Sequence, residues 1–469
     1  MAEKKPSRYL SLIKDTGIFA IGTLGSKLVL FFLVPLYTNI LDKEQYGTAE
    51  LVITIGQLVM PFISICIYEG MFRFGLSGEE KRERAFLNAS IIFVIGSVAM
   101  VAITPLFSFY HSVSVWKWYL CGYVVASFAS SNTLNYLKVK DRNKLYSILN
   151  ILHALLLVAC NVIFLIVIKT GIEGYLLSTI ISTVITVVLA FLFGGMISDL
   201  HNATYDSELM KEMILYSIPL ILNSVSWWVI HSSDKIMVEW ILDASLLGLY
   251  TAAAKIPSLM NVAITIFSQA WRLSSIKEYD SSNDTQFYSN VFKYYYEMIF
   301  GVCILITAIT KIFMKFYVGN NFFEAWRFVP LLLLSAAFNA FSSFSGSMFE
   351  ALKKSKTVMS TTLIAGIINI VLNFILIPLI GVYGAVLGTL GAYIVIAILR
   401  MRGVYKHIKI DYSLKKFIPL VLITVIQTVL VTLDFHIYIV SGAVMIVYLI
   451  ICFRDFSEVT KMIKKIIRR

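Results

Sequence analysis

Charged residues are scarce in this chain of 469 residues. Asp, Glu, Lys and Arg make up 14% of it, whereas a soluble domain carries about 25%. This is too little charge to coat a water-soluble globule of this size. Aromatic residues also make up 14%, which is the reverse of a disordered composition. With 58% hydrophobic residues, the remaining class is an integral membrane protein.

Catalytic and metal-binding motifs are also lacking. The five cysteines lie in or at the ends of apolar segments without C-x-x-C spacing, which disfavours a disulfide framework or a metal site. No phosphate-binding loop, H-E-x-x-H or G-x-S-x-G motif occurs. We therefore expect no enzyme activity and no cofactor, with proton or sodium coupling left open. Basic residues in loops that flank helices argue against nucleic-acid binding.

Long apolar runs dominate the rest of the chain. Crossing the membrane takes about 20 such residues in a helix, and fourteen runs qualify. They are residues 16–39, 48–68, 86–109, 116–137, 146–168, 174–197, 214–233, 246–271, 294–312, 329–349, 357–377, 382–399, 417–433 and 437–453. We predict an all-α integral membrane protein with 14 transmembrane helices.

The basic residues predict the orientation of these helices. If both termini are cytoplasmic, 31 of the 40 Lys and Arg residues fall on the cytoplasmic side and seven in external loops. This bias is a strong positive-inside signal. The loop at 198–213 fits least well, because Lys211 is its only basic residue. The basic end of the chain, 461–469, predicts a helix on anionic lipids.

An internal repeat divides the chain. Leu41-Asp42 followed by Gly47 is matched by Leu242-Asp243 followed by Gly248, and Gly171 to Gly174 is matched by Gly381 to Gly384. Similar offsets at corresponding helices predict a parallel repeat of six helices per half. The predicted domains are an N-terminal lobe at 1–200, a C-terminal lobe at 201–404, and helices 13 and 14 with the basic tail at 405–469.

Two lysines fall well inside apolar runs. Lys27 lies in the first run and Lys255 in the eighth. A lysine near the bilayer centre costs about 2.5–3.5 kcal/mol on insertion scales. We therefore expect both to face a wet cavity or an acidic partner. Binding of an anionic substrate is the favoured hypothesis, and a structural ion pair is the alternative.

Other polar residues at or near helix ends form a second group of candidates. Arg73 and Arg272 close corresponding helices on the cytoplasmic side and are candidates for substrate binding, although an ordinary positive-inside anchor explains Arg73 equally well. The candidates for coupling or gating are Glu69, Asp234, Lys235, Glu297, His153 and Asn161. For Asp234, Lys235 and Glu297 a solvated helix end or an ion pair is the alternative, and for His153 and Asn161 an interhelical hydrogen bond.

Several segments together resemble the Wzx-type polysaccharide flippases of the MOP exporter superfamily, which includes the MATE and MurJ-like proteins. They are Gly25 to Lys27, Pro35 to Gly47, Glu69-Gly70, Arg73-Phe74, Asp234-Lys235, Gly248 to Tyr250, Lys255-Ile256 and Asn369 to Gly384. The resemblance implies a V-shaped bundle of two six-helix lobes with two further helices. It also implies that Lys27, Arg73 and Lys255 contact a pyrophosphate, although lysine stands where arginine is expected at some of these positions.

The function implied is a flippase that moves undecaprenyl-pyrophosphate-linked oligosaccharides across the bacterial cytoplasmic membrane by alternating access, for O-antigen, capsule or exopolysaccharide synthesis. Its expected partners are the polyprenyl-pyrophosphate-linked glycan, anionic lipids and other polysaccharide-assembly proteins. A MATE-like cation-coupled small-molecule exporter is an alternative, but it predicts an acidic cavity. A membrane enzyme such as a polymerase is a further alternative, but it predicts a long external loop.

Overall fold

The computed structural model of the chain describes residues 29, 31–281 and 285–467. In this part of the chain the secondary structure is helical, without a β-strand. The all-α prediction is confirmed. The chain divides into two compact units, Met1–Gly248 and Leu249–Arg469, called unit 1 and unit 2 below. The division into lobes at 1–200 and 201–404 stays a prediction.

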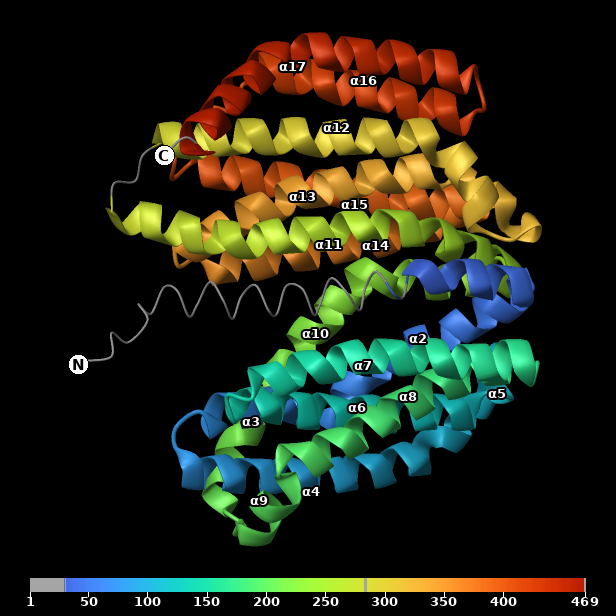
Figure 1. The fold of residues 1–469 in the computed structure, drawn as a ribbon, viewed down its shortest axis with the longest axis vertical. Coiled ribbons are helices and arrows are strands. Elements are labelled where there is room, and N and C mark those ends of the chain that lie inside the picture. The colour runs from blue at the N-terminus through green and yellow to red at the C-terminus, as the bar shows by residue number, and fades with distance from the viewer. Residues whose placement is uncertain (1–28, 30, 282–284, 468–469) are drawn as a thin grey trace. The chain divides into compact units, whose positions relative to one another are not determined.

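Unit 1 is a bundle of long helices in which α6 (Lys117–Val139), α7 (Asn143–Asn161) and α8 (Ile172–Gly194) lie side by side (Figure 1). A helical segment at Phe31–Ile40 precedes them. The labelled elements of unit 1 are α2 (Lys43–Ser64), α3 (Ile67–Gly75), α4 (Glu79–Ile103), η1 (Thr104–Phe109), α5 (His111–Ser114), α6 (Lys117–Val139), α7 (Asn143–Asn161), η2 (Val162–Val167), α8 (Ile172–Gly194), α9 (Met196–Asn202) and α10 (Ser207–Ile241). The short helix α9 lies in the loop that the sequence analysis placed at 198–213.

The predicted second span is interrupted rather than continuous. Pro61 inside α2 has no N–H to donate, and the helix ends at Ser64. Ile65 and Cys66 then both adopt the left-handed conformation, with φ 51°. For a β-branched residue such as Ile65 this conformation is strained. The consequence is a separate helix, α3, which carries Glu69 and Arg73.

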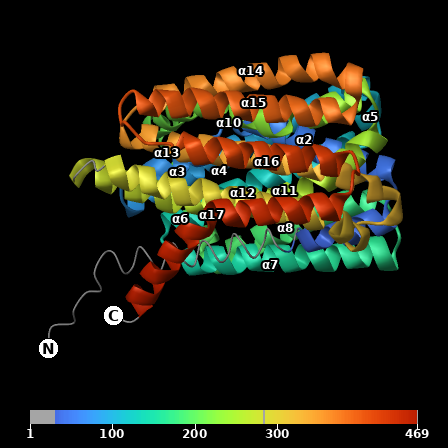
Figure 2. The same ribbon diagram turned by 90° about the horizontal axis from the view of Figure 1, so that it is seen from above.

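Unit 2 is built around α13 (Val329–Ala351). This helix is buried along almost its whole length because α12 (Thr285–Tyr317), α15 (Val382–Tyr405) and α16 (Leu414–Thr432) pack against it. Its elements are the greater part of α11 (Ala244–Ser281), then α12 (Thr285–Tyr317), η3 (Asn320–Arg327), α13 (Val329–Ala351), α14 (Ser355–Ile380), α15 (Val382–Tyr405), α16 (Leu414–Thr432) and α17 (Ile437–Ile467). The pair α16–α17 packs beside α12 (Figure 1). Figure 2 shows the C-terminal end of α17 turning away from the other helices of unit 2.

Eleven helices of the described part are long and apolar enough to cross a membrane. Two shorter apolar helices, Phe31–Ile40 and Ile437–Phe453, coincide with the first and last predicted runs. The fourth predicted run coincides with α6, which is long enough but rich in Ser and Asn. The chain is therefore a multi-pass membrane protein, and the count of fourteen spans stays a prediction.

Both repeated sequence motifs adopt matching local structures. The Oδ1 of Asp42 accepts the backbone N–H of Gln45 at 2.8 Å, and the Oδ1 of Asp243 accepts that of Leu246 at the same distance. Gly171 and Gly381 cap α8 and α15 with nearly equal angles, φ 62° and ψ −131° against φ 61° and ψ −140°. This region of backbone space is accessible to glycine almost alone. The equal geometry supports the predicted duplication.

Candidate functional site

A buried ion pair lies inside unit 1, between α2 and α10. The Oε2 of Glu50 lies 3.2 Å from the Nζ of Lys235, and its Oε1 accepts the hydroxyl of Tyr175 at 3.0 Å. The Glu50 side chain is only 6% exposed and that of Lys235 20%. A buried carboxylate requires partners for its charge and its lone pairs. Lys235, predicted as a coupling or gating residue, therefore has an ion-pair partner that the sequence analysis did not assign to it.

Two further carboxylates are buried near the same end of α10. Glu239 accepts the hydroxyl groups of Tyr110 and Ser112. Asp234 is also buried, and its Oδ1 accepts the backbone N–H of Lys235 at 2.8 Å. Glu239 in α10 thus has hydrogen-bond donors from the segment that follows α4.

Lys255 lies on α11 and is half-buried. Pro257 follows two residues later inside the same helix. The Oγ of Ser258 donates to the carbonyl of Lys255 at 2.6 Å. A proline removes a helical N–H donor, and a serine that bonds back to the preceding turn often bends a helix. Lys255, the described lysine of the predicted substrate set, therefore lies in a helical turn that contains a proline and a back-bonded serine. Lys27, its predicted counterpart, lies outside the described residues.

The two predicted arginines differ in their surroundings. Arg272 in α11 pairs with Glu350 of α13, with Nε and Oε2 at 2.6 Å, and its side chain is 55% exposed. Arg73 in α3 is exposed, as is Glu69 one turn earlier. Arg272 therefore acts in the structure as one partner of an ion pair, and its role in substrate binding stays a prediction.

His153 and Asn161, both in α7, have separate partners. The Nε2 of His153 lies 3.3 Å from the Oγ1 of Thr183 in α8, which is the interhelical contact that the sequence analysis gave as the alternative. The Nδ2 of Asn161 donates to the carbonyl of Leu157 within α7 at 2.7 Å. A relay between the two stays a prediction.

Glu297 belongs to an ionic network that joins three helices of unit 2. Its Oε1 lies 2.8 Å from the Nζ of Lys416 in α16. Lys416 also pairs with Asp455 of α17, and Lys293 of α12 pairs with the same carboxylate. Both carboxylates are buried. The network attaches α16 and α17 to α12, which favours the ion-pair alternative for Glu297.

Sequence analysis missed one buried arginine, Arg400 of α15, because it ends an apolar run and resembles a loop anchor. Its guanidinium donates to oxygens of Thr361, Thr362, Ser342 and Val358 at 2.8–3.3 Å. These oxygens are uncharged and come from α13 and α14. Arg400 thus joins three helices of unit 2 through hydrogen bonds.

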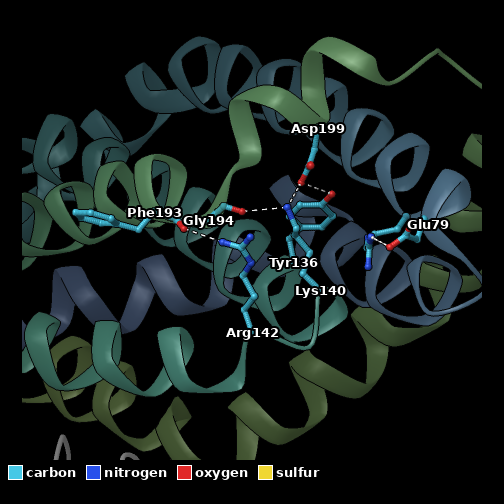
Figure 3. Close-up of polar contacts among 8 residues, drawn as sticks. Glu79, Tyr136, Lys140, Arg142, Phe193, Gly194 and Asp199 are labelled. Atoms are coloured by element: carbon cyan, nitrogen blue, oxygen red, sulfur yellow. Dashed lines mark hydrogen bonds and ion pairs between the residues drawn. The ribbon is translucent and has the colours of Figure 1, made fainter.

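A second missed cluster surrounds the C-terminal end of α8 (Figure 3). The Nζ of Lys140 lies 2.5 Å from Asp199 and 3.0 Å from the carbonyl of Gly194, and Tyr136 donates to the same carboxylate at 2.8 Å. Arg142 donates to the carbonyl of Phe193 at 2.8 Å. Cations at a helix C-terminus neutralise its partial negative charge. These residues hold α9 against α8. The sequence feature that could have indicated this cluster is the run of basic residues at 138–144.

Comparison with solved structures places the fold. The chain is similar to the lipid II flippase MurJ in its inward closed conformation, with a TM-score of 0.71 and 14% identity, over 93% of this chain and 99% of that one. It is also similar to an inward-facing multidrug resistance MATE family transporter of the MOP superfamily, with a TM-score of 0.64 and 15% identity, over 83% and 99%. The predicted MurJ/MATE-like fold is confirmed.

Sequence comparison gives the family. An uncharacterized membrane protein of Methanocaldococcus jannaschii is 23% identical over 433 residues, which span 85% of this chain and all of that protein. The sequence profile described as "Polysaccharide biosynthesis protein" matches residues 12–272, more than half of the chain. The chain belongs to the polysaccharide biosynthesis protein family.

Proposed function

We propose that the protein is a flippase for polyprenyl-pyrophosphate-linked oligosaccharides, the building units of O-antigen, capsule or exopolysaccharide. The observation that carries the proposal is Lys255, a cationic side chain inside the apolar helix α11 of a chain from this family. A lysine at such a position is costly unless it faces protein, water or a ligand. A pyrophosphate supplies the matching charge, and the ammonium group acts on it as a point charge.

The proposed transport cycle follows from the charge distribution. Lys27 and Lys255 attract the pyrophosphate, Arg73 and Arg272 are the further cations proposed to bind it, and the polyprenyl chain remains in lipid. The protein lies in the bacterial cytoplasmic membrane with both termini in the cytoplasm, since the basic residues concentrate on that side. Alternating access then exposes the sugar on the opposite face. Other polysaccharide-assembly proteins receive it there.

A MATE-like exporter of organic cations is the competing proposal. It requires carboxylates able to receive a cation. In unit 1, Glu50 already pairs with Lys235, and Glu239 accepts two hydroxyl groups. Because these partners satisfy the buried acids, the arrangement favours an anionic substrate. We further propose that no step of covalent catalysis occurs and that any coupling to protons or sodium does not displace the partners of these buried acids.

The test is a flipping assay in proteoliposomes with a fluorescent polyprenyl-pyrophosphate-linked oligosaccharide. Lys255→Ala removes the cation, and we expect the flipping rate to fall by about tenfold or more. Lys255→Arg keeps the charge and should retain part of the rate. Lys27→Ala should reproduce the effect of Lys255→Ala.

The matched control is Lys315→Ala, which removes an exposed lysine near the end of α12. Its flipping rate should equal that of the unaltered protein. Full flipping activity in a Lys27→Ala/Lys255→Ala double variant contradicts the proposal. Efflux of an organic cation, with no flipping of the lipid-linked sugar, supports the exporter instead.

A further inference from the structure

The two copies of the Asp-x-x-x-x-Gly repeat touch each other within unit 1. A methyl group placed on Gly47 would lie 1.8 Å from the carbonyl oxygen of Ala244. A methyl group placed on Gly248 would lie 2.2 Å from the carbonyl oxygen of Lys43. Both distances are far below a van der Waals contact, so only glycine fits at either position. We call this pair of contacts the glycine clasp.

The glycine clasp is reciprocal. The glycine of each copy packs against the carbonyl of the residue four positions before the other glycine. Each copy also begins its helix with an aspartate cap, Asp42 for α2 and Asp243 for α11. The first turns of α2 and α11 therefore meet backbone to backbone, with no side chain between them.

The glycine clasp lies at the point where the chain passes from unit 1 to unit 2. Unit 1 ends at Gly248 and unit 2 begins at Leu249, so the chain passes between the units once, inside α11. The first turn of α11 is fixed to α2. Any change in the direction of α11 must then occur further along the helix.

Two features lower the cost of such a change in one turn of α11. Pro257 leaves the carbonyl of Ala253 without its helical N–H donor. The Oγ of Ser258 bonds to the carbonyl of Lys255 at 2.6 Å and competes with the regular helical pattern. Lys255 itself carries one of these two altered carbonyls and lies two residues before Pro257. Bending at this turn therefore displaces the Lys255 ammonium.

We propose that α11 is the pivot helix of the transporter, with the glycine clasp as its fixed end and the turn at 253–258 as its bending point. Pro257 is then a positioning residue that acts through Lys255. This inference rests on the proposed flippase function for its transport readout, and on the fold alone for its conformational readout. In domain closure, large backbone rotations are absorbed at a small number of hinge residues.

The first experiment replaces the bending point in the full-length protein. Pro257→Ala restores the helical N–H, and we expect the flipping rate to fall by about tenfold while binding of the lipid-linked oligosaccharide stays within about twofold. Pro419→Ala, at a proline inside α16, is the matched control and should leave both quantities unchanged. Flipping at the unaltered rate in Pro257→Ala overturns the pivot.

A spectroscopic readout separates this inference from the substrate assignment. Spin labels at Ser245→Cys and Thr265→Cys bracket the bend about 30 Å apart along a straight helix. With Pro257 in place we expect a broad distribution of distances between the two labels. In the Pro257→Ala background the distribution should narrow and shift toward the distance of a straight helix. Identical distributions in both backgrounds overturn the pivot. If Lys255→Ala flips normally while Pro257→Ala narrows the distribution, the substrate site fails and the pivot stands.

The second experiment tests whether the glycine clasp is a fixed end. In the Lys43→Cys/Ala244→Cys variant the two thiols should cross-link on oxidation. The cross-linked protein should keep its flipping rate within about twofold, because the fixed end of a pivot does not open. Absence of cross-linking overturns the clasp. Loss of flipping on cross-linking, with recovery on reduction, shows that the contact must part and overturns its assignment as a fixed end.

Discussion

The ion pair between Glu50 and Lys235 gives the sharpest prediction for stability. Lys235→Met removes the ammonium and keeps the length of the side chain. At the observed separation of 3.2 Å and an effective dielectric constant of about 20, the lost attraction is about 5 kcal/mol. Breaking a buried pair by removing one partner costs about 3–5 kcal/mol in measured cases. The hydroxyl of Tyr175 still satisfies one oxygen of Glu50, so we expect a loss of about 3–4 kcal/mol.

The assay is equilibrium unfolding of the purified protein in mixed micelles by titration with a denaturing detergent. The matched control is Lys311→Met, because Lys311 pairs with Asp434 at 2.6 Å with side chains 29% and 36% exposed. An exposed pair contributes about 0–1 kcal/mol. The free energy of unfolding should therefore fall several times more for Lys235→Met than for the control.

The double variant Lys235→Met/Glu50→Gln completes the argument. It removes both charges, and we expect it to be more stable than Lys235→Met by about 1–3 kcal/mol, because no unpaired charge remains buried. Equal losses in Lys235→Met and Lys311→Met would refute the reasoning, since they would place Glu50 in a medium that screens charge as water does. A double variant less stable than Lys235→Met would refute it as well.

Two further predictions concern the ends of helices in unit 1. Gly47→Ala should lower the melting temperature of the purified protein or separate the glycine clasp, because the new methyl group would lie 1.8 Å from the oxygen of Ala244. Gly442→Ala is the control and should leave the melting temperature unchanged, because the space around Gly442 is open. Equal melting temperatures for the two variants, with the cross-link between positions 43 and 244 intact in Gly47→Ala, would contradict this prediction. The backbone N–H of Leu209 and the nearby Arg84 lower the pKa of Asp206, which caps α10. Its stabilising effect is therefore present at neutral pH and is lost as pH falls through the folded-state pKa. Asp206→Asn should flatten the acid limb of the melting temperature against pH, and an unchanged limb would contradict the assignment.

Long-range architecture was largely predictable in this protein because a membrane imposes it locally. A helix must satisfy its own backbone polar groups in lipid, so each span is written into about 20 consecutive residues. Thirteen of the fourteen predicted runs coincide with described helices, and the first does so in part. The interruption at Ile65 and Cys66 was not predictable, since the residues around it are as apolar as those of a continuous helix.

The candidate site was less predictable, because partners come from distant parts of the chain. Lys235 and Glu297 were recognised as polar residues near helix ends, but their partners Glu50 and Lys416 lie 185 and 119 residues away. Arg400 has the sequence position of a cytoplasmic anchor, but its guanidinium donates five hydrogen bonds to α13 and α14. Charge and position along the chain are visible in a sequence, whereas the carboxylate or hydroxyl that satisfies a buried charge is not.

The sequence by itself determined the membrane class, most of the helices, the internal repeat and the resemblance to the flippase family. These properties depend on composition and on short-range pattern, which a single chain displays directly. Only the tertiary structure decided which buried charges are paired, and that the two Asp-x-x-x-x-Gly motifs meet as the glycine clasp. The physical reason is that burial and close packing are properties of neighbours in space, and neighbours in space are set by the packing of whole helices.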